Sequence, residues 1–430
     1  MSIKILIANP PAYFDMFPDR HFIQAGSRWS FSMDAPKGSH KFPHYQPYPF
    51  NLAYATSILR ESGYDVEAFD GCALDMDEHE WFKRVEKINP YFLITEIPTV
   101  SFPLVINLLL KVKKELGCYI IVAGSHVTAL PREIPRGFML AEGEWELKLP
   151  FQYRSDIRSF ASYPFPDRTF FPNEQYSNFE FHRPSAQMLS SRGCPGSCIF
   201  CIERHVVYHS NKVRARHYRK VVDEMEYVQS LGAKQVWFDD MSLTADYRHA
   251  RNLCREIIDR GLDLPWTAMG DMLASEETVK LMAEAGCEGI AFGVESINPE
   301  VLKLIGKWWV SREKAIEFVK LLRKYDIYSV ATFSIGLPGH NKVSIIEDIK
   351  FATEELGADS VQFSIATPFP GTPFYRMCKR NGWLVTDDWT RYDGARYSVV
   401  SYPHLSHTEI EELHEYAMQV RREKRLGFRK

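Results

Sequence analysis

The 430-residue sequence has no long apolar run, little excess charge and few cysteines. No apolar stretch approaches the roughly twenty residues that a bilayer span needs, so we expect no membrane-spanning helix. The formal net charge of −3 gives the whole chain no attraction to nucleic acid or to anionic lipid. The chain opens on a strand-like run, Ile3–Ala8, in place of a targeting segment, and we therefore expect a cytoplasmic protein.

Eight cysteines in 430 residues are too sparse for a disulfide framework, yet three of them stand together. Cys194, Cys198 and Cys201 lie in the run SRGCPGSCIFC, residues 191–201. Thiolates are the usual ligands of iron–sulfur clusters, and a [4Fe–4S] cube has four irons to ligate. Three thiolates on one loop therefore leave one iron open to a substrate. We expect the isolated cysteines to be small buried apolar residues: Cys72, Cys118, Cys254, Cys287 and Cys378.

A zinc site is the main alternative for this loop. His205 follows Cys201 by four residues, so the loop could supply a set of three thiolates and one imidazole. Structural zinc usually takes its ligands from two separated pairs, and this sequence has no second cysteine pair. The spacing favours the iron–sulfur cluster.

The length of the chain predicts two domains, and residues 1–150 form the first. Short β-branched runs alternate there with helical patterns, which predicts a Rossmann-like, doubly wound parallel sheet of the α/β class. Such sheets bind ligands beyond the carboxyl ends of their strands, although ordinary turns are the simpler explanation of any single end. The expected strands are Ile3–Ala8, Val66–Phe69, Phe92–Thr95 and Tyr119–Ala123, and the helices are Phe50–Glu61, Glu78–Ile88 and Pro103–Leu116.

The second domain, residues 185–400, follows a Pro-rich linker at 151–184. Six strand–helix repeats predict an incomplete (β/α)6 barrel related to the TIM fold, and residues 401–430 add a C-terminal helical cap. Chemistry in such barrels sits at the carboxyl ends of the strands. Polar or Gly-rich stops fall at that rim in the cysteine loop, Asp239-Asp240, Glu295-Ser296, residues 336–339 and residues 367–371.

The cysteine spacing, with an aromatic residue before the last cysteine, resembles the cluster motif of the radical SAM superfamily. Nearly the whole chain resembles the branch of that superfamily with an N-terminal cobalamin-binding domain. The resemblance implies three cofactors: a [4Fe–4S] cluster on Cys194, Cys198 and Cys201, S-adenosylmethionine (SAM) and cobalamin. It implies contacts to SAM from Phe200, Asp239, Asp240, Glu295, Gly336 and Leu337. A carboxylate at a strand end can also cap a helix, and that alternative stays open for Asp240 and Glu295.

Two departures from the family pattern bear on these contacts. The third βα loop reads AMGDM, residues 268–272, where relatives often carry an arginine for the SAM carboxylate. The first domain lacks the Asp-any-His-any-any-Gly motif that supplies a cobalt-ligating histidine, as many members of this branch do. The implied cobalamin contacts are Asn9, Pro10, Thr95, Gly124, Ser125, His126 and Glu142. Domains of this kind also persist without a cofactor.

Two segments suggest accessory roles. Residues 14–48 are rich in aromatic side chains and are interpreted as a flap over the cobalamin or the substrate. Residues 204–220 are basic, and they are either a solvated loop or a docking patch for an acidic electron donor such as flavodoxin or ferredoxin.

The predicted function is that of an enzyme. A cluster of this kind cleaves SAM to methionine and a 5′-deoxyadenosyl radical, which abstracts hydrogen from an unactivated carbon. With cobalamin, the resemblance implies a C-methyltransferase acting on a small-molecule substrate whose class the residues do not specify. The alternatives are a radical SAM cyclase, an oxidase, and a dehydratase or deoxygenase with an empty or non-methylating first domain. A zinc-stabilised binding protein is the alternative outside catalysis.

Overall fold

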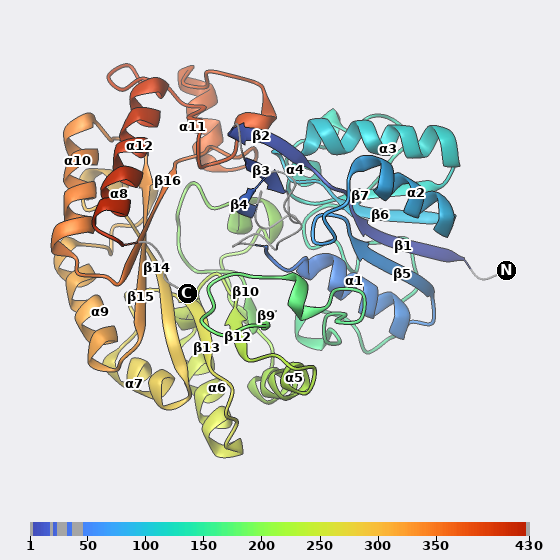
Figure 1. The fold of residues 1–430 in the computed structure, drawn as a ribbon, viewed down its shortest axis with the longest axis horizontal. Helices are drawn as coiled ribbons and strands as arrows, with labels where there is room; N and C mark the ends of the chain where they lie inside the picture. Colours follow the sequence, from blue (N-terminus) through green and yellow to red (C-terminus); the bar gives the residue numbers. More distant parts are fainter. Residues whose placement is uncertain (1–2, 18–19, 24–31, 37–45, 427–430) are drawn as a thin grey trace. The chain divides into compact units, whose positions relative to one another are not determined.

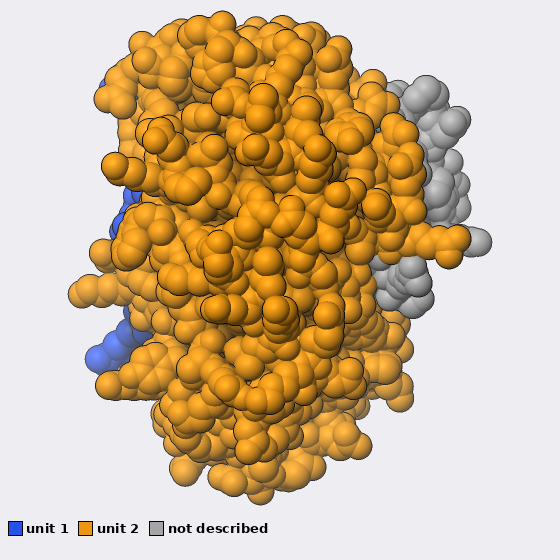
Figure 2. Space-filling view, turned by 90° about the vertical axis from the view of Figure 1, so that its left-hand side faces the viewer, with its two compact units in different colours: residues 1–178, 202–209 blue, residues 179–201, 210–430 orange. Residues whose placement is uncertain are grey.

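The structure is a computed structural model, and it describes residues 3–17, 20–23, 32–36 and 46–426. The chain divides into two compact units, which Figure 2 draws in different colours. The first unit comprises residues 1–178 and 202–209, and the second comprises residues 179–201 and 210–430. The domain limits expected from the sequence, at 150, 184 and 400, stay predictions.

The first unit is built on a five-stranded parallel sheet with the strand order β5-β1-β6-β7-β8. Because β5 pairs with one edge of β1 and β6 with the other, the strand order reverses at β1. Ligand crevices in open α/β sheets lie beside such a reversal, at the carboxyl ends of the strands. The strands are β1 (Lys4–Asn9), β5 (Asp65–Asp70), β6 (Phe92–Glu96), β7 (Tyr119–Ala123) and β8 (Met139–Leu140).

Helices cover both faces of this sheet, with α2 and α3 on one side and α1 on the other (Figure 1). Trp81 of α2 and Leu109 of α3 pack with Leu6 and Leu93 of the strands in a buried apolar core. Helix α2 begins in a capping box, because Asp77 accepts the backbone N–H of Glu80. The helices are α1 (Phe50–Glu61), α2 (Glu78–Ile88), α3 (Phe102–Leu116) and the short α4 (Ser125–Ala129).

Part of the segment interpreted as a flap forms a three-stranded antiparallel sheet. Its strands are β2 (Tyr13–Phe17), β3 (Arg20–Ile23) and β4 (Ser32–Pro36). Residues 18–19, 24–31 and 37–45 of the expected flap lie outside the described residues. The flap role stays a prediction.

The second unit contains six parallel strands in sequential order, β9-β12-β13-β14-β15-β16. Sequential parallel strands with crossover helices confirm the predicted incomplete barrel. A two-stranded ribbon of β10 and β11 lies outside this sheet. The strands are β9 (Ser185–Met188), β10 (Ser191–Arg192), β11 (Arg214–Ala215), β12 (Gln235–Phe238), β13 (Trp266–Gly270), β14 (Cys287–Glu295), β15 (Tyr328–Ile335) and β16 (Ser360–Ile365).

The crossover helices lie along one side of these strands (Figure 1). Polar residues start several of them, as at α6, where Asp246 accepts the backbone N–H groups of Arg248 and His249. The helices are α5 (Tyr218–Ser230), α6 (Tyr247–Arg260), α7 (Glu276–Glu284), α8 (Pro299–Ile305), α9 (Arg312–Lys324), α10 (Lys342–Lys350), α11 (Pro373–Asn381) and α12 (His407–Glu423). Within the described ranges, no helix combines the length and the apolar character that a bilayer crossing requires.

The face of the strands that is not covered by the crossover helices changes from apolar to polar along β14. Phe179 packs against Trp237, Ala291 and Val330 in an apolar cluster. Two and four residues farther along β14 the same face carries a glycine and Glu295. Along β14, this face therefore changes from apolar to polar toward the carboxyl end of the strand.

Candidate functional site

The cysteine loop begins directly after β9 and β10, at the carboxyl rim of the barrel. The thiols of Cys194, Cys198 and Cys201 are all half-buried, whereas the other five cysteines are buried, as predicted. A β-carbon placed on Gly196 would lie 3.3 Å from Cys194 Sγ and 3.9 Å from Cys198 Sγ. Two of the three sulfurs thus flank one glycine, and the glycine leaves room between them.

Gly193 sets the entry into this loop. Its φ of +90° lies in the left-handed region, and an added β-carbon would stand 2.2 Å from the carbonyl oxygen of Lys212. The ribbon of β10 and β11 brings Lys212 to this place, since β10 ends immediately before Gly193. Only glycine fits at position 193, so the backbone position immediately before Cys194 is fixed.

Asp240 anchors the other side of the loop entrance. Its Oδ1 accepts the backbone N–H of Ser190 at 2.7 Å, and its Oδ2 accepts the hydroxyls of Ser190 and Ser191, each at 2.6 Å. His249 Nε2 lies 3.0 Å from the same Ser190 hydroxyl. Both carboxylate oxygens of Asp240 therefore hold the chain that leads into the cysteines, which is a positioning role. Its predicted contact to SAM stays a prediction.

Glu295, at the end of β14, forms an ion pair that the sequence did not indicate. Its Oε1 lies 3.0 Å from Lys307 Nζ, and its Oε2 accepts the hydroxyl of Ser334 at 2.8 Å. Lys307 Nζ also donates to the carbonyl oxygen of Gly293 at 2.6 Å. A β-carbon on Gly293 would stand 2.3 Å from Glu295 Oε1, so glycine makes room for the pair.

Glu295 is also one of the few non-glycine residues with a positive φ, +68°. Such a conformation costs of the order of 1 kcal/mol and persists where surrounding contacts impose it. The strand register shifts between Gly293 and Glu295, which turns the carboxylate toward Lys307 and Ser334. Strain of this kind is concentrated at functional sites.

The Glu295–Lys307 pair is electrostatically coupled to the cysteine loop. Burial raises the pKa of the Cys198 thiol to about 11, an effect that Lys307 opposes and Glu295 reinforces. Burial alone would lower the pKa of Lys307, but Glu295, Cys198 and Asp271 together raise the pKa above its ordinary value. Lys307 therefore stays charged beside the thiols. A metal that binds these thiols must displace their protons, and the neighbouring ammonium stabilises the thiolates that result.

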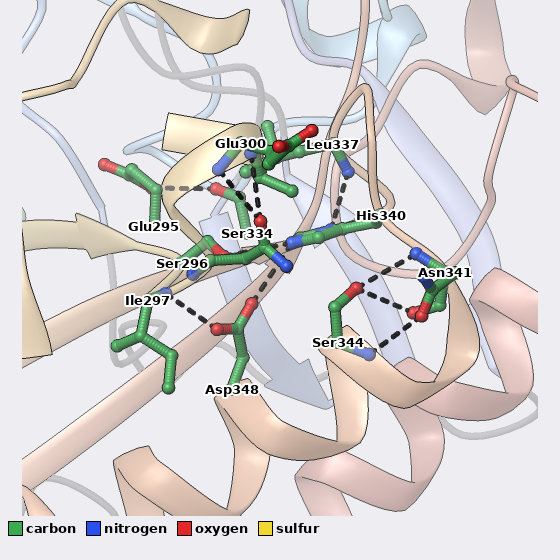
Figure 3. Close-up of polar contacts among 12 residues, drawn as sticks. Glu295, Ser296, Ile297, Glu300, Ser334, Leu337, His340, Asn341, Ser344 and Asp348 are labelled. Atoms are coloured by element: carbon green, nitrogen blue, oxygen red, sulfur yellow. Dashed lines mark hydrogen bonds and ion pairs between the residues drawn. The ribbon is translucent and has the colours of Figure 1, made fainter. Parts of the chain in front are cut away.

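A buried histidine ties together two of the loops that the sequence predicted to contact SAM (Figure 3). His340 Nδ1 accepts the backbone N–H of Leu337 at 3.1 Å. Nε2 then carries the ring proton, and it faces Asp348 Oδ2 at 3.1 Å and the Ser296 hydroxyl at 3.3 Å. Asp348 Oδ1 accepts the backbone N–H of Ile297 at 2.7 Å. The ends of β14 and β15 are thus held in one polar network.

The remaining predicted SAM residues of the second unit lie on the same rim. Phe200 is half-buried in the cysteine loop, and Asp239 is buried at the end of β12. Gly336 follows β15 with a φ of +83°, and its carbonyl oxygen accepts the Tyr402 hydroxyl at 2.9 Å. In the third loop, Asp271 accepts the hydroxyl of Ser242 at 2.6 Å. The loop at residues 268–272 thus supplies the carboxylate of Asp271 where relatives often have arginine. A cation is supplied by Lys307, which the fold brings to Glu295.

In the first unit, the carboxyl ends of β1, β6 and β7 bring most of the predicted cobalamin residues to one edge of the sheet. Asn9 is buried and donates to Asp70 Oδ1 at 3.0 Å, and the Pro10 carbonyl accepts the Cys72 thiol at 3.3 Å. Burial raises the pKa of Asp70 to about 6. Asn9 and Pro10 thus contribute to internal packing, while Thr95, Gly124, Ser125 and His126 lie on the neighbouring strand ends.

Two hydroxyls at this edge, those of Thr95 and Thr99, are buried and have no hydrogen-bond partner among the residues that the structure describes. Gly124, with a φ of +101°, passes so close to the backbone of Ile97 that an added β-carbon would lie 2.9 Å from its nitrogen. Buried hydroxyls are normally satisfied, so this edge has unused capacity to bind a polar ligand. The sequence did not indicate Thr99, which is buried in the turn after β6.

His126 and Glu142 differ in their surroundings. His126 is fully buried and stacks on Phe102 with ring centroids 4.0 Å apart, and burial lowers its pKa to about 3. Glu142 is exposed after β8. Glu96, which the sequence did not indicate, accepts Asn51 Nδ2 at 2.9 Å and Trp145 Nε1 at 2.7 Å. Glu96 therefore joins helix α1 to the segment that follows β8.

The proposed docking patch at residues 204–220 needs a correction. Arg216 is not on the surface: it is fully buried and its Nη1 lies 2.5 Å from Glu224 Oε2. Arg219 is 3.5 Å from Glu256, so its charge is partly neutralised as well. The number of basic residues in the sequence overestimates the exposed positive charge, because the Arg216 guanidinium lies in a buried ion pair with Glu224.

The described residues contain no group of three His, Cys, Asp or Glu side chains arranged to hold a single metal ion. The donor set of the loop is three thiols with a glycine between two of them. Three thiols can ligate three of the four irons of a [4Fe–4S] cube, with one cysteine on each iron.

Residues 188–352 match the family model of the Radical SAM superfamily. This segment of the chain is similar to that superfamily. The radical SAM domain spans the cysteine loop, the Glu295–Lys307 pair and the His340 network, and it implies that the protein is an enzyme with a [4Fe–4S] cluster and SAM as its cofactors.

Two curated relatives are named as methyltransferases. An uncharacterized methyltransferase of Pyrococcus horikoshii is 28% identical over 401 residues, which is 85% of each chain. The cytidylyl-2-hydroxyethylphosphonate methyltransferase of Streptomyces wedmorensis is 29% identical over 276 residues, 60% of this chain and 51% of the relative. This chain thus spans most of the first relative and about half of the second.

The similarity to a solved structure extends beyond the residues that match the radical SAM family model. The structure of the radical S-adenosylmethionine methyltransferase TsrM from Kitasatospora setae, with cobalamin and a [4Fe–4S] cluster bound, superposes with a TM-score of 0.65. The match covers 96% of this chain and 85% of TsrM at 19% sequence identity. The likeness covers nearly the whole chain and confirms the predicted combination of a Rossmann-like sheet with a partial barrel.

Proposed function

We propose that the protein is a cobalamin-dependent radical SAM C-methyltransferase that acts on an unactivated carbon of a small molecule. The observation that carries the proposal is the half-buried three-cysteine loop beside the Glu295–Lys307 pair, at the carboxyl rim of the barrel. When bound there, the cluster supplies the electron that cleaves SAM to methionine and a 5′-deoxyadenosyl radical. The protein holds and orients SAM and keeps water from the radical.

Three cysteines would hold three irons and leave the fourth to the amino and carboxylate groups of SAM. Lys307 and Glu295 offer opposite charges within reach of the same loop, and both side chains are nearly buried. A methionine end also carries one positive and one negative group. We assign Lys307 to the carboxylate and Glu295 to the ammonium or the ribose hydroxyls, since such pairs strengthen as water leaves the site.

The first unit supports cobalamin as the second cofactor. The unpartnered hydroxyls of Thr95 and Thr99 and the close backbone approach at Gly124 suit a large polar ligand at the carboxyl edge of the sheet. TsrM, which shares this fold, is described with cobalamin bound, and the two curated relatives are named as methyltransferases. Thr95, Thr99 and the loop at residues 124–126 would contact the cofactor.

The test is product analysis with SAM labelled in its methyl group. Methylation of an unactivated carbon consumes two molecules of SAM, of which one yields 5′-deoxyadenosine and the other S-adenosylhomocysteine. The anaerobically reconstituted protein with a strong reductant should form both products when cobalamin is present. The Cys198→Ala variant should form neither, and the Cys118→Ala variant, at an isolated cysteine, should keep both. Formation of 5′-deoxyadenosine without S-adenosylhomocysteine would reject methylation in favour of a cyclase or oxidase.

A further inference from the structure

Gln362, in the middle of β16, is the only exposed residue among the described residues of the six parallel strands of the second unit. Its neighbours Val361 and Phe363 are buried. Side chains alternate between the two faces of a strand, so Gln362 and Ser364 point to the face that the crossover helices leave uncovered. That face is therefore accessible to solvent at the level of Gln362.

The neighbouring strands continue this accessible surface. Thr332 of β15 is paired with Gln362, and Ser334 is paired with Ser364. Gly293 of β14 stands opposite Thr332 and adds no side chain there. Paired residues point to the same face, and the three hydroxyl side chains are all half-buried. We call Thr332, Gln362 and Ser364 the polar wall.

The polar wall has capacity for hydrogen bonds. Among the described residues, neither the Gln362 amide nor the Ser364 hydroxyl has a hydrogen-bond partner. The Thr332 hydroxyl makes one long contact, of 3.5 Å, to the carbonyl oxygen of Phe292. Accessible amides and hydroxyls exchange hydrogen bonds with water for hydrogen bonds with a ligand. A ligand on this surface would therefore meet three polar groups that the protein itself hardly uses.

Toward the amino ends of the strands, the same face is apolar and closed. Val330 packs there with Phe179 and Trp237. A β-carbon on Gly289 would lie 2.7 Å from Phe179 Cζ, so the aromatic ring covers the strand at that level. The Thr267 hydroxyl donates to the carbonyl oxygen of Phe179 and holds it in place. The polar wall thus stands above an apolar floor and is open only toward the rim.

The charged side chains next to the polar wall are already compensated. Glu295 pairs with Lys307 at 3.0 Å. Asp271 accepts the hydroxyls of Ser242 at 2.6 Å and of Thr244 at 3.2 Å. The polar wall itself contains no ionisable side chain. An anionic group buried there would lose its hydration without gaining a cation, whereas a neutral group that donates and accepts would match the amide and the hydroxyls.

We propose that the polar wall binds the methyl acceptor and selects an acceptor with a neutral carboxamide or hydroxyl group on an apolar body. The inference rests on the proposed function, because it assigns the substrate of that reaction. Thr332 lies two residues before Ser334, which is bonded to Glu295 (Figure 3). Two residues of a strand span about 7 Å, so an acceptor on the polar wall would lie beside the SAM that we assign to Glu295 and Lys307.

Identification of the acceptor tests the predicted class. The full chain, loaded with its cofactors, is incubated with SAM that carries a deuterated methyl group and with a small-molecule extract of the source cells. Mass spectrometry then finds the product that gains the label, which should contain a carboxamide or a hydroxyl group. A labelled hydrocarbon, or a product whose only polar groups are carboxylate or phosphate, would overturn the proposal. Absence of any labelled product would instead reject the proposed function.

Kinetics with that acceptor test the residues. Gln362→Leu keeps the approximate size and should raise the KM for the acceptor about five- to tenfold, because hydrogen bonds to the amide are lost. The KM for SAM and the midpoint of urea unfolding should stay those of the parent. Gln419→Leu, at an exposed glutamine of α12, is the control and should leave both KM values unchanged. An unchanged KM for the acceptor in Gln362→Leu, or a raised KM for SAM, would overturn the proposal.

A change of charge tests the selectivity directly. An analogue of the acceptor with a carboxylate in place of its neutral group should react with a kcat/KM at least about tenfold lower in the parent, because the charge finds no partner. Gln362→Arg should reduce or reverse this preference, since a guanidinium pairs with a carboxylate. Equal use of both compounds by the parent, or the same preference in Gln362→Arg, would overturn the proposal.

Discussion

Lys307 sets the electrostatics of the candidate site. It lies at 3.0 Å from Glu295 and stays charged beside the Cys198 thiol. A nearly buried cation beside the Cys198 thiol and one carboxylate favours binding of an anionic group, and it also favours thiolate over thiol. The same side chain can thus serve both the cluster and SAM.

The Lys307→Met variant should separate these two effects. Loss of one charged hydrogen bond to SAM should raise the KM for SAM by about ten- to a hundredfold, because such bonds contribute about 1.5–3 kcal/mol. The kcat should fall less, and the iron content should stay close to that of the parent protein. Lys320→Met, at an exposed position of α9, is the control and should leave KM unchanged. An unaltered KM in Lys307→Met would contradict the assignment.

His126 makes the first unit sensitive to acid. Its pKa is lowered to about 3 by burial, so the folded chain keeps it neutral while the unfolded chain takes up a proton below pH 6.5. The stability that it contributes is present above pH 6.5 and is lost as the pH falls toward 3. Between pH 7.5 and pH 5 the loss should be about 2 kcal/mol.

Hydrogen exchange of the β7 peptide in a urea series measures this loss. The His126→Gln variant should lose about 2 kcal/mol less than the parent between the two pH values, since glutamine does not titrate. His79→Gln, at a residue on the exposed side of α2, is the control. A pH dependence that is identical in the parent and in His126→Gln would show that the histidine is accessible to protons in the folded state.

The sequence predicted the residues whose chemistry is local. The spacing of the three cysteines and the position of Glu295 at a strand end made these residues predictable. The sequence does not identify Lys307 as a site residue. Helix α8 and Gly306, which has a φ of +78°, bring Lys307 back to Glu295 although twelve residues separate them. Thr99 was missed for the same reason. Contacts that depend on a turn of the backbone have no periodic signal in the sequence.

At the scale of elements, the His340–Asp348 pair joins α10 to the ends of β14 and β15. Asp348 holds Ile297 with one oxygen and faces the His340 ring with the other. His340 in turn fixes Leu337. Two loops that would border SAM are therefore positioned by one buried pair, which touches no cofactor itself.

The Asp348→Asn variant should loosen both loops. Asparagine keeps the acceptor for Ile297, but its NH2 group faces the N–H of His340, and two opposed buried donors should cost about 1–3 kcal/mol of unfolding free energy. SAM affinity should fall several-fold. Asp359→Asn is the matched control, because Asp359 holds Ser329 at the opposite end of β15, with hydrogen bonds of 2.9 and 2.6 Å. The control should lose stability without losing SAM affinity, and equal SAM affinity in both variants would contradict the positioning role.

Most elements were predictable, and the exceptions have physical causes. Continuous apolar runs bounded by turns identified the parallel strands, and β7 and α2 have the predicted limits. Helix α8 was missed although its signals are present: Asn298 caps Glu300 and Val301, Pro299 follows, and Gly306 ends the helix. At seven residues, α8 is too short to show a helical period. The strands β2–β4 were not predicted, because an aromatic-rich stretch with prolines has no clear alternation.

At the scale of the whole molecule, the sequence predicted the pairing of a Rossmann-like sheet with a partial barrel. It did not predict that residues 202–209 belong to the first compact unit, although residues on both sides of them belong to the second. Membership of a unit depends on tertiary contacts, whereas composition changes only at the Pro-rich stretch. The family resemblance predicted the fold, and the tertiary contacts revealed the Glu295–Lys307 ion pair and the His340 network.

The central claim is that three cysteines hold the cluster and leave one iron to SAM. The most direct measurement is electron–nuclear double resonance of the reduced, reconstituted protein with SAM labelled with 15N in its amino group and 17O in its carboxylate. If SAM chelates the open iron through both groups, hyperfine coupling of both labels to the cluster is expected. The account predicts no cluster signal after any one of Cys194, Cys198 or Cys201 is replaced by alanine. A reduced cluster without coupling to either label, or protein that binds zinc in place of iron and sulfide, would contradict the account.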